Sequence, residues 1–173
     1  MPSDLVRRID LDHVYPRLLT LFLECLSACR ARGADYWAVS GYRNFSQQAS
    51  LYFQGRTMPG AKVTNAGPGF SWHNYGAAID VARDKDVARA GLQPEWADAG
   101  AYRILKEEGE RLGLQVGVPS VPGGDPGHVS LPFGAVTGRA ERALLGELRK
   151  IHLEDLRKES LPACWERMDA WLG

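Results

Sequence analysis

Two of the four histidines stand close to aspartates in glycine-containing segments, a combination that can bind a metal ion or transfer protons. Asp80 follows His73 by seven residues and ends an apolar run, where burying an unpaired carboxylate would be costly. Asp125 and His128 are the ends of the tetrapeptide Asp-Pro-Gly-His, and proline followed by glycine at its centre favours a type II turn. Such a turn would hold the carboxylate of Asp125 next to the imidazole of His128.

Each aspartate also has a purely structural interpretation. Asp80 could form an ion pair with Arg43 or Arg83, or it could cap a helix over residues 81–90. The aspartate and histidine of the tetrapeptide could be joined by a hydrogen bond that only closes the turn. Neither segment taken alone decides between structure and chemistry.

Taken together, the two segments supply the ligand set of a catalytic zinc site. His73, Asp80 and His128 are two imidazoles and one carboxylate, which leave a fourth position of zinc open to water. Asp125 is then a spare carboxylate beside a ligand, where it could accept and return the proton of an activated water. The chain has no His-Glu-x-x-His, Gly-x-Ser-x-Gly or phosphate-loop motif, which disfavours the enzyme classes that carry them.

Composition limits the kind of protein further. The 173 residues contain 21 Lys and Arg against 21 Asp and Glu, and 45% are hydrophobic, as in an ordinary globular domain. The absence of a basic excess disfavours nucleic acid as a partner. The N-terminal residues MPSDLVRRIDLDHVYP have no apolar core, so we expect neither a signal peptide nor a membrane span. Because an odd number of cysteines leaves one unpaired, we expect Cys25, Cys29 and Cys164 to be reduced thiols of a cytosolic product.

Hydrophobic periodicity predicts the elements that must position the site. Helices are expected over 12–32, 44–54 and 95–112, and two more within 139–171 that separate near 160–162. Strands are expected over 36–40, 61–64, 77–82, 114–118 and 129–133. The stretch 59–76 is otherwise a glycine-rich loop, which favours a site over a spacer in a compact domain.

Three blocks of residues follow one another along the chain. They are Ser40-Gly41-Tyr42-Arg43 with Gln48, Leu51-Tyr52 and Gln54-Gly55-Arg56-Thr57; Val63-Thr64-Asn65-Ala66 through Ser71-x-His73-x-x-Gly76-x-Ala78-x-Asp80; and Asp125-x-x-His128. In these blocks the chain resembles the zinc D-alanyl-D-alanine carboxypeptidases and L-alanyl-D-glutamate endopeptidases that cut peptidoglycan stem peptides, many phage endolysins among them. The resemblance covers roughly residues 10–135.

The resemblance implies a role for each residue of the site. It implies that one catalytic zinc ion is bound by His73, Asp80 and His128, that Asp125 is the catalytic acid and base, that Arg43 supports the substrate carbonyl or oxyanion, and that Ser71 and Gln48 contact substrate. A structural ion pair is the alternative for Arg43. Two departures from the family pattern, Val129-Ser130 after the last ligand and the segment 117–124 before it, indicate a differently shaped substrate groove.

The resemblance also implies a fold and an activity. The expected fold is α+β, of the hedgehog and DD-peptidase type, with a small mainly antiparallel sheet and packed helices. Residues 1–138 would be the catalytic domain of a monomer whose partner is the peptidoglycan stem peptide. Gln-Gly-Arg-Thr and Val-Thr-Asn-Ala favour an endopeptidase made in the cytoplasm without a signal peptide, which acts on the wall after release in phage or prophage lysis. The alternatives are a D-alanyl-D-alanine carboxypeptidase and a non-catalytic wall-binding or phage structural module.

Residues 139–173 lie outside the resemblance, and we expect them to form a helical extension packed on the catalytic domain. Trp165, Met168, Trp171 and Leu172 recur at spacings of three or four, which is typical of a helix with one apolar face. Acidic and basic residues are balanced in this segment, which disfavours a cationic membrane-disrupting tail.

Overall fold

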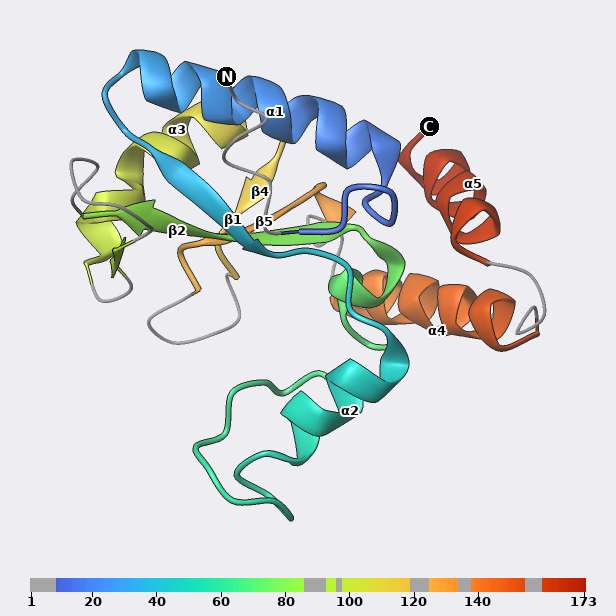
Figure 1. The fold of residues 1–173 in the computed structure, drawn as a ribbon. Coiled ribbons are helices and arrows are strands. Elements are labelled where there is room, and N and C mark those ends of the chain that lie inside the picture. The colour runs from blue at the N-terminus through green and yellow to red at the C-terminus, as the bar shows by residue number, and fades with distance from the viewer. Residues whose placement is uncertain (1–8, 86–92, 96–97, 119–124, 134–137, 155–159) are drawn as a thin grey trace. The chain divides into compact units, whose positions relative to one another are not determined.

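The computed structural model describes residues 9–85, 93–95, 98–118, 125–133, 138–154 and 160–173 (Figure 1). The chain divides into two compact units, each made of two separate stretches of sequence. The first unit comprises residues 1–41 and 78–132, and the second unit comprises residues 42–77 and 133–173. The predicted border at 138/139 remains a prediction, although residues 139–173 share the second unit with residues 42–77.

The first unit contains a five-stranded antiparallel sheet. Its path runs β1-β2-β5-β4, and β3 pairs with β2 off this path. The strands are β1 (Tyr36–Ser40), β2 (Ala78–Asp84), β3 (Pro94–Glu95), β4 (Gln115–Val116) and β5 (His128–Ser130). Each recorded strand pair is antiparallel, which confirms the expected α+β class with a small antiparallel sheet.

Two helices cover one face of this sheet and pack against each other (Figure 1). Helix α1 (Pro16–Ala31) begins with a proline, which is favourable at the first helical position. Its apolar stripe from Leu18 to Cys29 is buried, as its helical spacing predicts. Helix α3 (Arg103–Arg111) continues from a 3-10 turn, η3 (Ala99–Tyr102). The core of the first unit therefore lies between these helices and the sheet.

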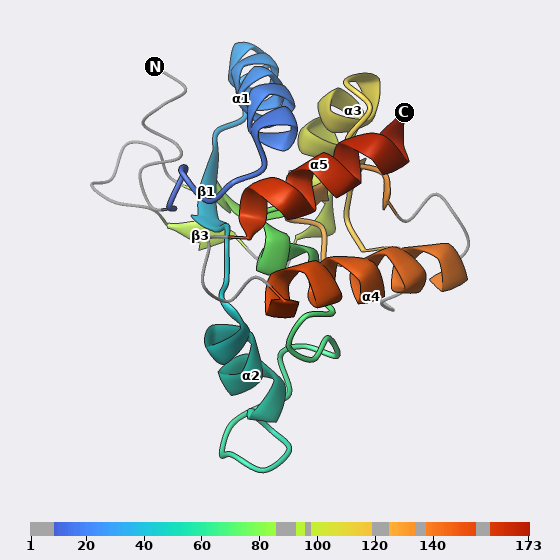
Figure 2. The same ribbon diagram turned by 90° about the vertical axis from the view of Figure 1, so that its right-hand side faces the viewer.

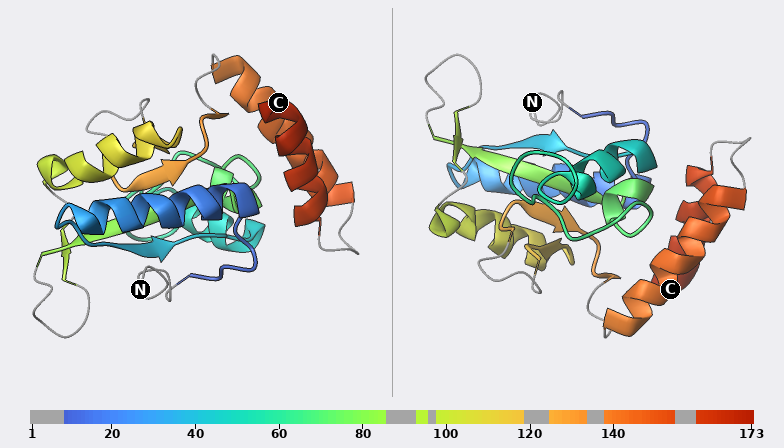
Figure 3. Two further views of the ribbon diagram at one scale, coloured as in Figure 1. Left: turned by 90° about the horizontal axis from the view of Figure 1, so that it is seen from above. Right: turned by 90° about the horizontal axis from the view of Figure 1, so that it is seen from below.

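The second unit is helical. It contains α2 (Phe45–Phe53), the 3-10 turn η2 (Trp72–Tyr75), α4 (Gly138–Glu154) and α5 (Leu161–Leu172). A reciprocal pair of hydrogen bonds between Asn44 and Gln47 begins α2. Helices α4 and α5 lie side by side (Figures 2 and 3) and bury leucines together with Cys164 and Met168 between them and their neighbours.

Several expectations about local structure were wrong. The helix expected from residue 95 begins at Arg103, because Pro94–Glu95 pairs with β2 instead. Residues 61–64 form no strand, since the backbone carbonyls of Thr64 and Ala66 accept hydrogen bonds from Arg56 and Gln48 side chains. The helix considered for residues 81–90 is also wrong over its first part, because β2 continues to Asp84.

Other expectations fall wholly or partly outside the described residues. These are the absence of a signal peptide at the N-terminus, most of the 81–90 segment, part of the 95–112 helix, most of the 117–124 segment and the connection between the last two helices. Cys25, Cys29 and Cys164 are buried free thiols. Among the described residues, none of the helices has both the length and the apolar character needed to cross a bilayer.

Candidate metal centre

Asp80 and His128 face each other on adjacent strands. Asp80 on β2 is in register with His128 on β5, and its carboxylate Oδ1 lies 2.9 Å from the imidazole Nδ1. Their side chains are 21% and 13% exposed, so both are partly shielded from water yet can still be reached by an ion. The antiparallel register is therefore what joins two of the predicted ligands that are far apart in sequence.

The turn before His128 lies unusually close to β2, where Gly127 approaches Val81. The His128 amide donates to the Asp125 carbonyl at 3.1 Å, and the Val81 amide donates to the Gly127 carbonyl at 2.9 Å. Gly127 is not among the glycines with positive φ, so the predicted type II turn is wrong. Glycine is needed here for a different reason, because an added Cβ would lie 2.2 Å from the carbonyl oxygen of Val81.

We expect Gly127→Ala to destabilise the protein by about 1–3 kcal/mol, because the added methyl group must push the turn away from β2. The same movement should weaken zinc binding by displacing His128. Urea denaturation and a zinc titration measure the two effects. Gly146→Ala is the matched control, since an added Cβ there meets no atom within 4 Å. If Gly127→Ala and the wild type have equal stability and equal zinc affinity, the close approach of Gly127 to Val81 is not important for the site.

His73 lies in the 3-10 turn η2, which leads directly into β2. The residue is 2% exposed, and its carbonyl oxygen accepts hydrogen bonds from the amides of Arg43 and Gly76. Gly76 ends the turn in the left-handed region, with a φ of 66°. The Asn74 side chain accepts a hydrogen bond from the Gly69 amide and donates one to the Arg43 carbonyl. The backbone that carries His73 is therefore held from both sides.

The three predicted ligands come together. One ligand atom from each of His73, Asp80 and His128 lies within 4.8 Å of the other two. Ligand atoms about 2.0–2.2 Å from one zinc ion are at most about 4.4 Å apart, so small side-chain adjustments suffice. Two imidazoles and one carboxylate suit zinc and leave a position open. In the part of the chain that the structure describes, no other group of histidine, cysteine and carboxylate side chains is arranged in this way.

The remaining predicted residues have distinct surroundings. Asp125 is exposed and begins the turn that ends at His128. Arg43 is joined to the histidine turn through its backbone amide and carbonyl. Ser71 precedes η2 and is half-buried, and its carbonyl accepts a hydrogen bond from the Asn74 amide. Gln48 is fully buried and donates to the Ala66 carbonyl at 2.8 Å, so it supports the loop that precedes the turn.

Sequence reasoning missed several residues that support the site. Trp72 and Tyr75 stand at positions that the second block leaves unspecified, yet both are buried and flank His73. Gly127 was noticed only for its effect on turn type. The signal available in the sequence was the presence of aromatic residues, Trp72 and Tyr75, on either side of the proposed ligand His73. Glu141 and Trp165, which contact Trp72 and Tyr75, gave no such signal because they are distant in sequence.

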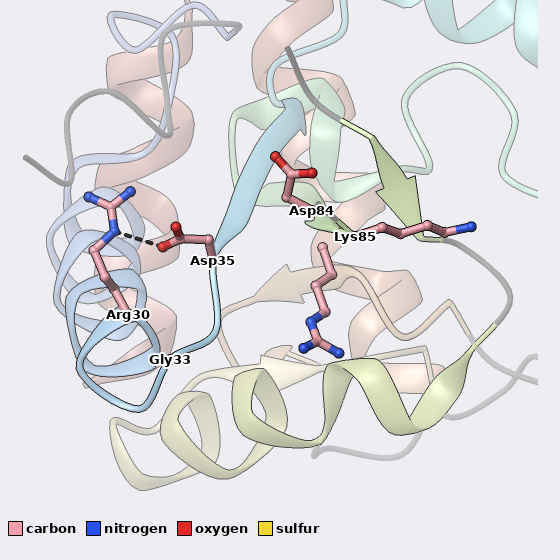
Figure 4. Close-up of a pocket in the computed structure, with 6 residues that line it drawn as sticks. Arg30, Gly33, Asp35, Asp84 and Lys85 are labelled. Carbon is pink, nitrogen blue, oxygen red and sulfur yellow. Dashed lines mark hydrogen bonds and ion pairs between the residues drawn. The ribbon is translucent and has the colours of Figure 1, made fainter. Parts of the chain in front are cut away.

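A hollow in the first unit differs in its lining from the candidate metal centre (Figure 4). It is lined by charged side chains at the end of β2, where Arg30 and Asp35 form an ion pair at 2.7 Å. Lys85 is paired with Glu95 at 3.1 Å. No histidine or cysteine lines this hollow among the described residues, so it lacks the imidazole ligands of the candidate zinc site.

The family model of VanY, described as D-alanyl-D-alanine carboxypeptidase, matches residues 12–122, which is more than half of the 173-residue chain. The chain belongs to the VanY family. The match includes His73 and Asp80 and ends before Asp125 and His128. The register of β2 and β5 places His128 opposite Asp80, and the turn links Asp125 to His128.

A curated relative matches a shorter part of this VanY-family chain. It is the peptidoglycan L-alanyl-D-glutamate endopeptidase CwlK of Bacillus subtilis (strain 168), which is 48% identical over 59 residues. The matched segment is 34% of this chain and 35% of CwlK. The chain thus spans about a third of the length of this curated relative.

A solved VanY structure shares the fold. A variant of the vancomycin resistance D,D-pentapeptidase VanY in complex with Zn(II) is similar with a TM-score of 0.50 and 20% identity, covering 79% of this chain and 78% of that chain. VanYB in complex with D-Alanine-D-Alanine has a TM-score of 0.48 and 20% identity, with coverage of 82% and 83%. The first of these likenesses confirms the expected fold.

Proposed function

We propose that the protein is a zinc-dependent endopeptidase that cleaves the L-alanyl-D-glutamate bond of peptidoglycan stem peptides. The observation that carries the zinc assignment is the convergence of His73, Asp80 and His128 within 4.8 Å. The endopeptidase assignment is supported by the 48% identity to a segment of CwlK. A zinc ion held by His73, Asp80 and His128 would supply Lewis acidity at the scissile carbonyl and would lower the pKa of a bound water.

The side chains of this protein have separate tasks in the proposed reaction. Asp125 accepts the proton of the attacking water and later delivers it to the leaving amine, so it acts first as a base and then as an acid. The Arg43 guanidinium stabilises the negative charge that develops on the carbonyl oxygen. Ser71 contacts the substrate at the start of the histidine turn. Because Gln48 is buried and donates to the Ala66 carbonyl, we assign it to supporting the loop that precedes the histidine turn.

The family description favours a second candidate, a D-alanyl-D-alanine carboxypeptidase. The two activities differ in what they release. A carboxypeptidase frees D-alanine from the end of a stem peptide, whereas the proposed endopeptidase creates a new N-terminal D-glutamate and leaves D-alanine in place.

Digestion of purified muropeptides followed by mass spectrometry separates the two activities. We expect new N-terminal D-glutamate, no free D-alanine and no cleavage after treatment with a chelator, with activity restored by added zinc. Release of D-alanine alone would establish the carboxypeptidase. A protein that binds zinc and walls but leaves every muropeptide intact would be a non-catalytic module, and the proposed function would be wrong.

We also propose that the protein acts on the cell wall as a phage or prophage endolysin. The segments Gln54-Gly55-Arg56-Thr57 and Val63-Thr64-Asn65-Ala66 support this assignment, because they resemble the endolysin branch more than the dipeptidase branch. Expression in a bacterial host with and without a separate pore-forming protein tests it. We expect lysis only when both are present, and growth that continues unchanged with both would contradict the endolysin role.

A further inference from the structure

The turn that carries His73 has few hydrogen bonds of its own. It is a 3-10 turn of four residues, and such short turns have poorer hydrogen-bond geometry than an α-helix. A metal ligand must be held to within about 0.5 Å of its productive position by groups around it. The contacts that fix this turn therefore decide how well it can present an imidazole.

Helix α4 contacts the residue immediately before the ligand. The Trp72 indole Nε1 donates to the Glu141 carboxylate at 2.9 Å. The indole ring also stacks on Phe133, with centroids 4.3 Å apart and an angle of 21° between the planes. Trp72 is 8% exposed, so its polar N–H is almost removed from water and depends on Glu141 for a partner.

Helix α5 contacts the residue two positions after the ligand. The Trp165 indole Nε1 donates to the Tyr75 backbone carbonyl at 2.8 Å. The Tyr75 hydroxyl donates to the Gly69 carbonyl at 2.8 Å, and the residue is fully buried. Helix α5 is thus hydrogen-bonded directly to the backbone of the turn. A change of side-chain rotamer within the turn would not break this bond.

His152 of α4 contacts both the histidine turn and the residue before α5. Its ring centroid lies 4.5 Å from that of Phe45 and 6.3 Å from that of Tyr75, while its Nδ1 lies 2.5 Å from the Ser160 hydroxyl before α5. Burial lowers the pKa of His152, which favours the neutral ring that suits this aromatic packing. The C-terminal helices are therefore connected to one another where they meet the turn.

We propose that α4 and α5 are part of the support of the metal centre, with Glu141 and Trp165 as positioning residues for the ligand His73. The inference rests on the proposed function, because it takes His73 to be a zinc ligand. Both helices lie beyond residue 122, where the VanY family match ends. Removing such supporting contacts typically weakens metal affinity by about 10–100-fold.

The test compares two tryptophan substitutions on the same helix. Trp165→Phe keeps an aromatic ring, although a smaller one, and removes the N–H donor to the Tyr75 carbonyl. Trp171→Phe is the matched control, because Trp171 contacts the Phe133 ring and its indole nitrogen makes no hydrogen bond within the described residues. The measurements are the zinc Kd, by competition with a chromogenic chelator, and the thermal midpoint of the metal-free protein.

We expect Trp165→Phe to raise the zinc Kd by about tenfold or more, while Trp171→Phe leaves it unchanged. An unchanged Kd in Trp165→Phe, or an equal rise in Trp171→Phe, would overturn the inference. Glu141→Leu and Glu141→Gln provide a second test, which can be carried out even if Trp165→Phe does not fold. The leucine variant should lose affinity, and the glutamine variant should retain it because the amide oxygen still accepts the Trp72 hydrogen bond.

The outcomes also separate this inference from the proposed function. If the wild-type protein binds no zinc, the proposed function is wrong and the inference fails with it. If the wild-type protein binds zinc and cleaves muropeptides while all four variants bind zinc equally well, only the positioning role is wrong. If all four variants lose thermal stability and affinity to the same extent, the helices stabilise the fold in general and do not position His73 in particular.

Discussion

Asp125→Asn should retain zinc and lose about 10²–10⁴-fold in the rate of muropeptide cleavage, which is the range that one acid–base group contributes. Asparagine suits the first position of a β-turn as well as aspartate does, so the Asp125–His128 turn should be preserved. It cannot accept a proton from water near neutral pH. The measurements are the initial rate of cleavage by mass spectrometry and the zinc content of the purified variant.

Asp12→Asn is the control for this substitution, because Asp12 is also an exposed aspartate of the first unit. It should cleave at the wild-type rate. If Asp125→Asn cleaves equally fast, another group is the base. If instead the variant loses its zinc, Asp125 serves the metal centre as a ligand or support, and its proposed acid–base role would have to be abandoned.

His73→Ala and His128→Ala should each weaken zinc binding by more than about 100-fold, beyond the loss expected for a supporting residue. Two protein ligands cannot hold a tetrahedral zinc ion as well as three. Cleavage should fall to the level of the chelator-treated wild type. The zinc Kd and the cleavage rate are measured on the same preparations.

Thermal unfolding adds a readout that does not depend on substrate. Zinc at 1,000 times its Kd should stabilise the wild-type protein by about 4 kcal/mol, and it should stabilise the two histidine variants far less. His13→Ala is the control, because His13 lies next to Asp10 near the N-terminus, 2.6 Å from its carboxylate. A His73→Ala protein that keeps the wild-type response to zinc would remove His73 from the ligand set.

The C-terminal helices bear on how the chain can be shortened. A division at residue 138 would separate Trp72 from Glu141 and Tyr75 from Trp165, although each pair lies within one compact unit. Both hydrogen bonds end on residues that flank a proposed ligand. For this reason the full chain, rather than residues 1–138, is the appropriate protein for every assay described above.

The sequence alone predicted the main elements and the composition of the candidate site. Apolar spacing identified α1, and β-branched and aromatic residues identified β1, because both patterns report which side chains must leave water. The ligand types at His73, Asp80 and His128 were also recognisable, since a half-buried carboxylate near imidazoles needs a partner. These inferences depend on residue chemistry and short spacings, which are written directly in the chain.

Other features were decided only by tertiary structure. The role of Gly127 comes from the approach of Val81, and the loop over residues 64–66 is held by Gln48 and Arg56. The ends of the histidine turn are bonded by Glu141 and Trp165. Local propensity contains no information about such partners, which lie far away in sequence. The proposed ligands could therefore be inferred from the sequence, whereas the groups that hold them in place become known only when distant segments have packed together.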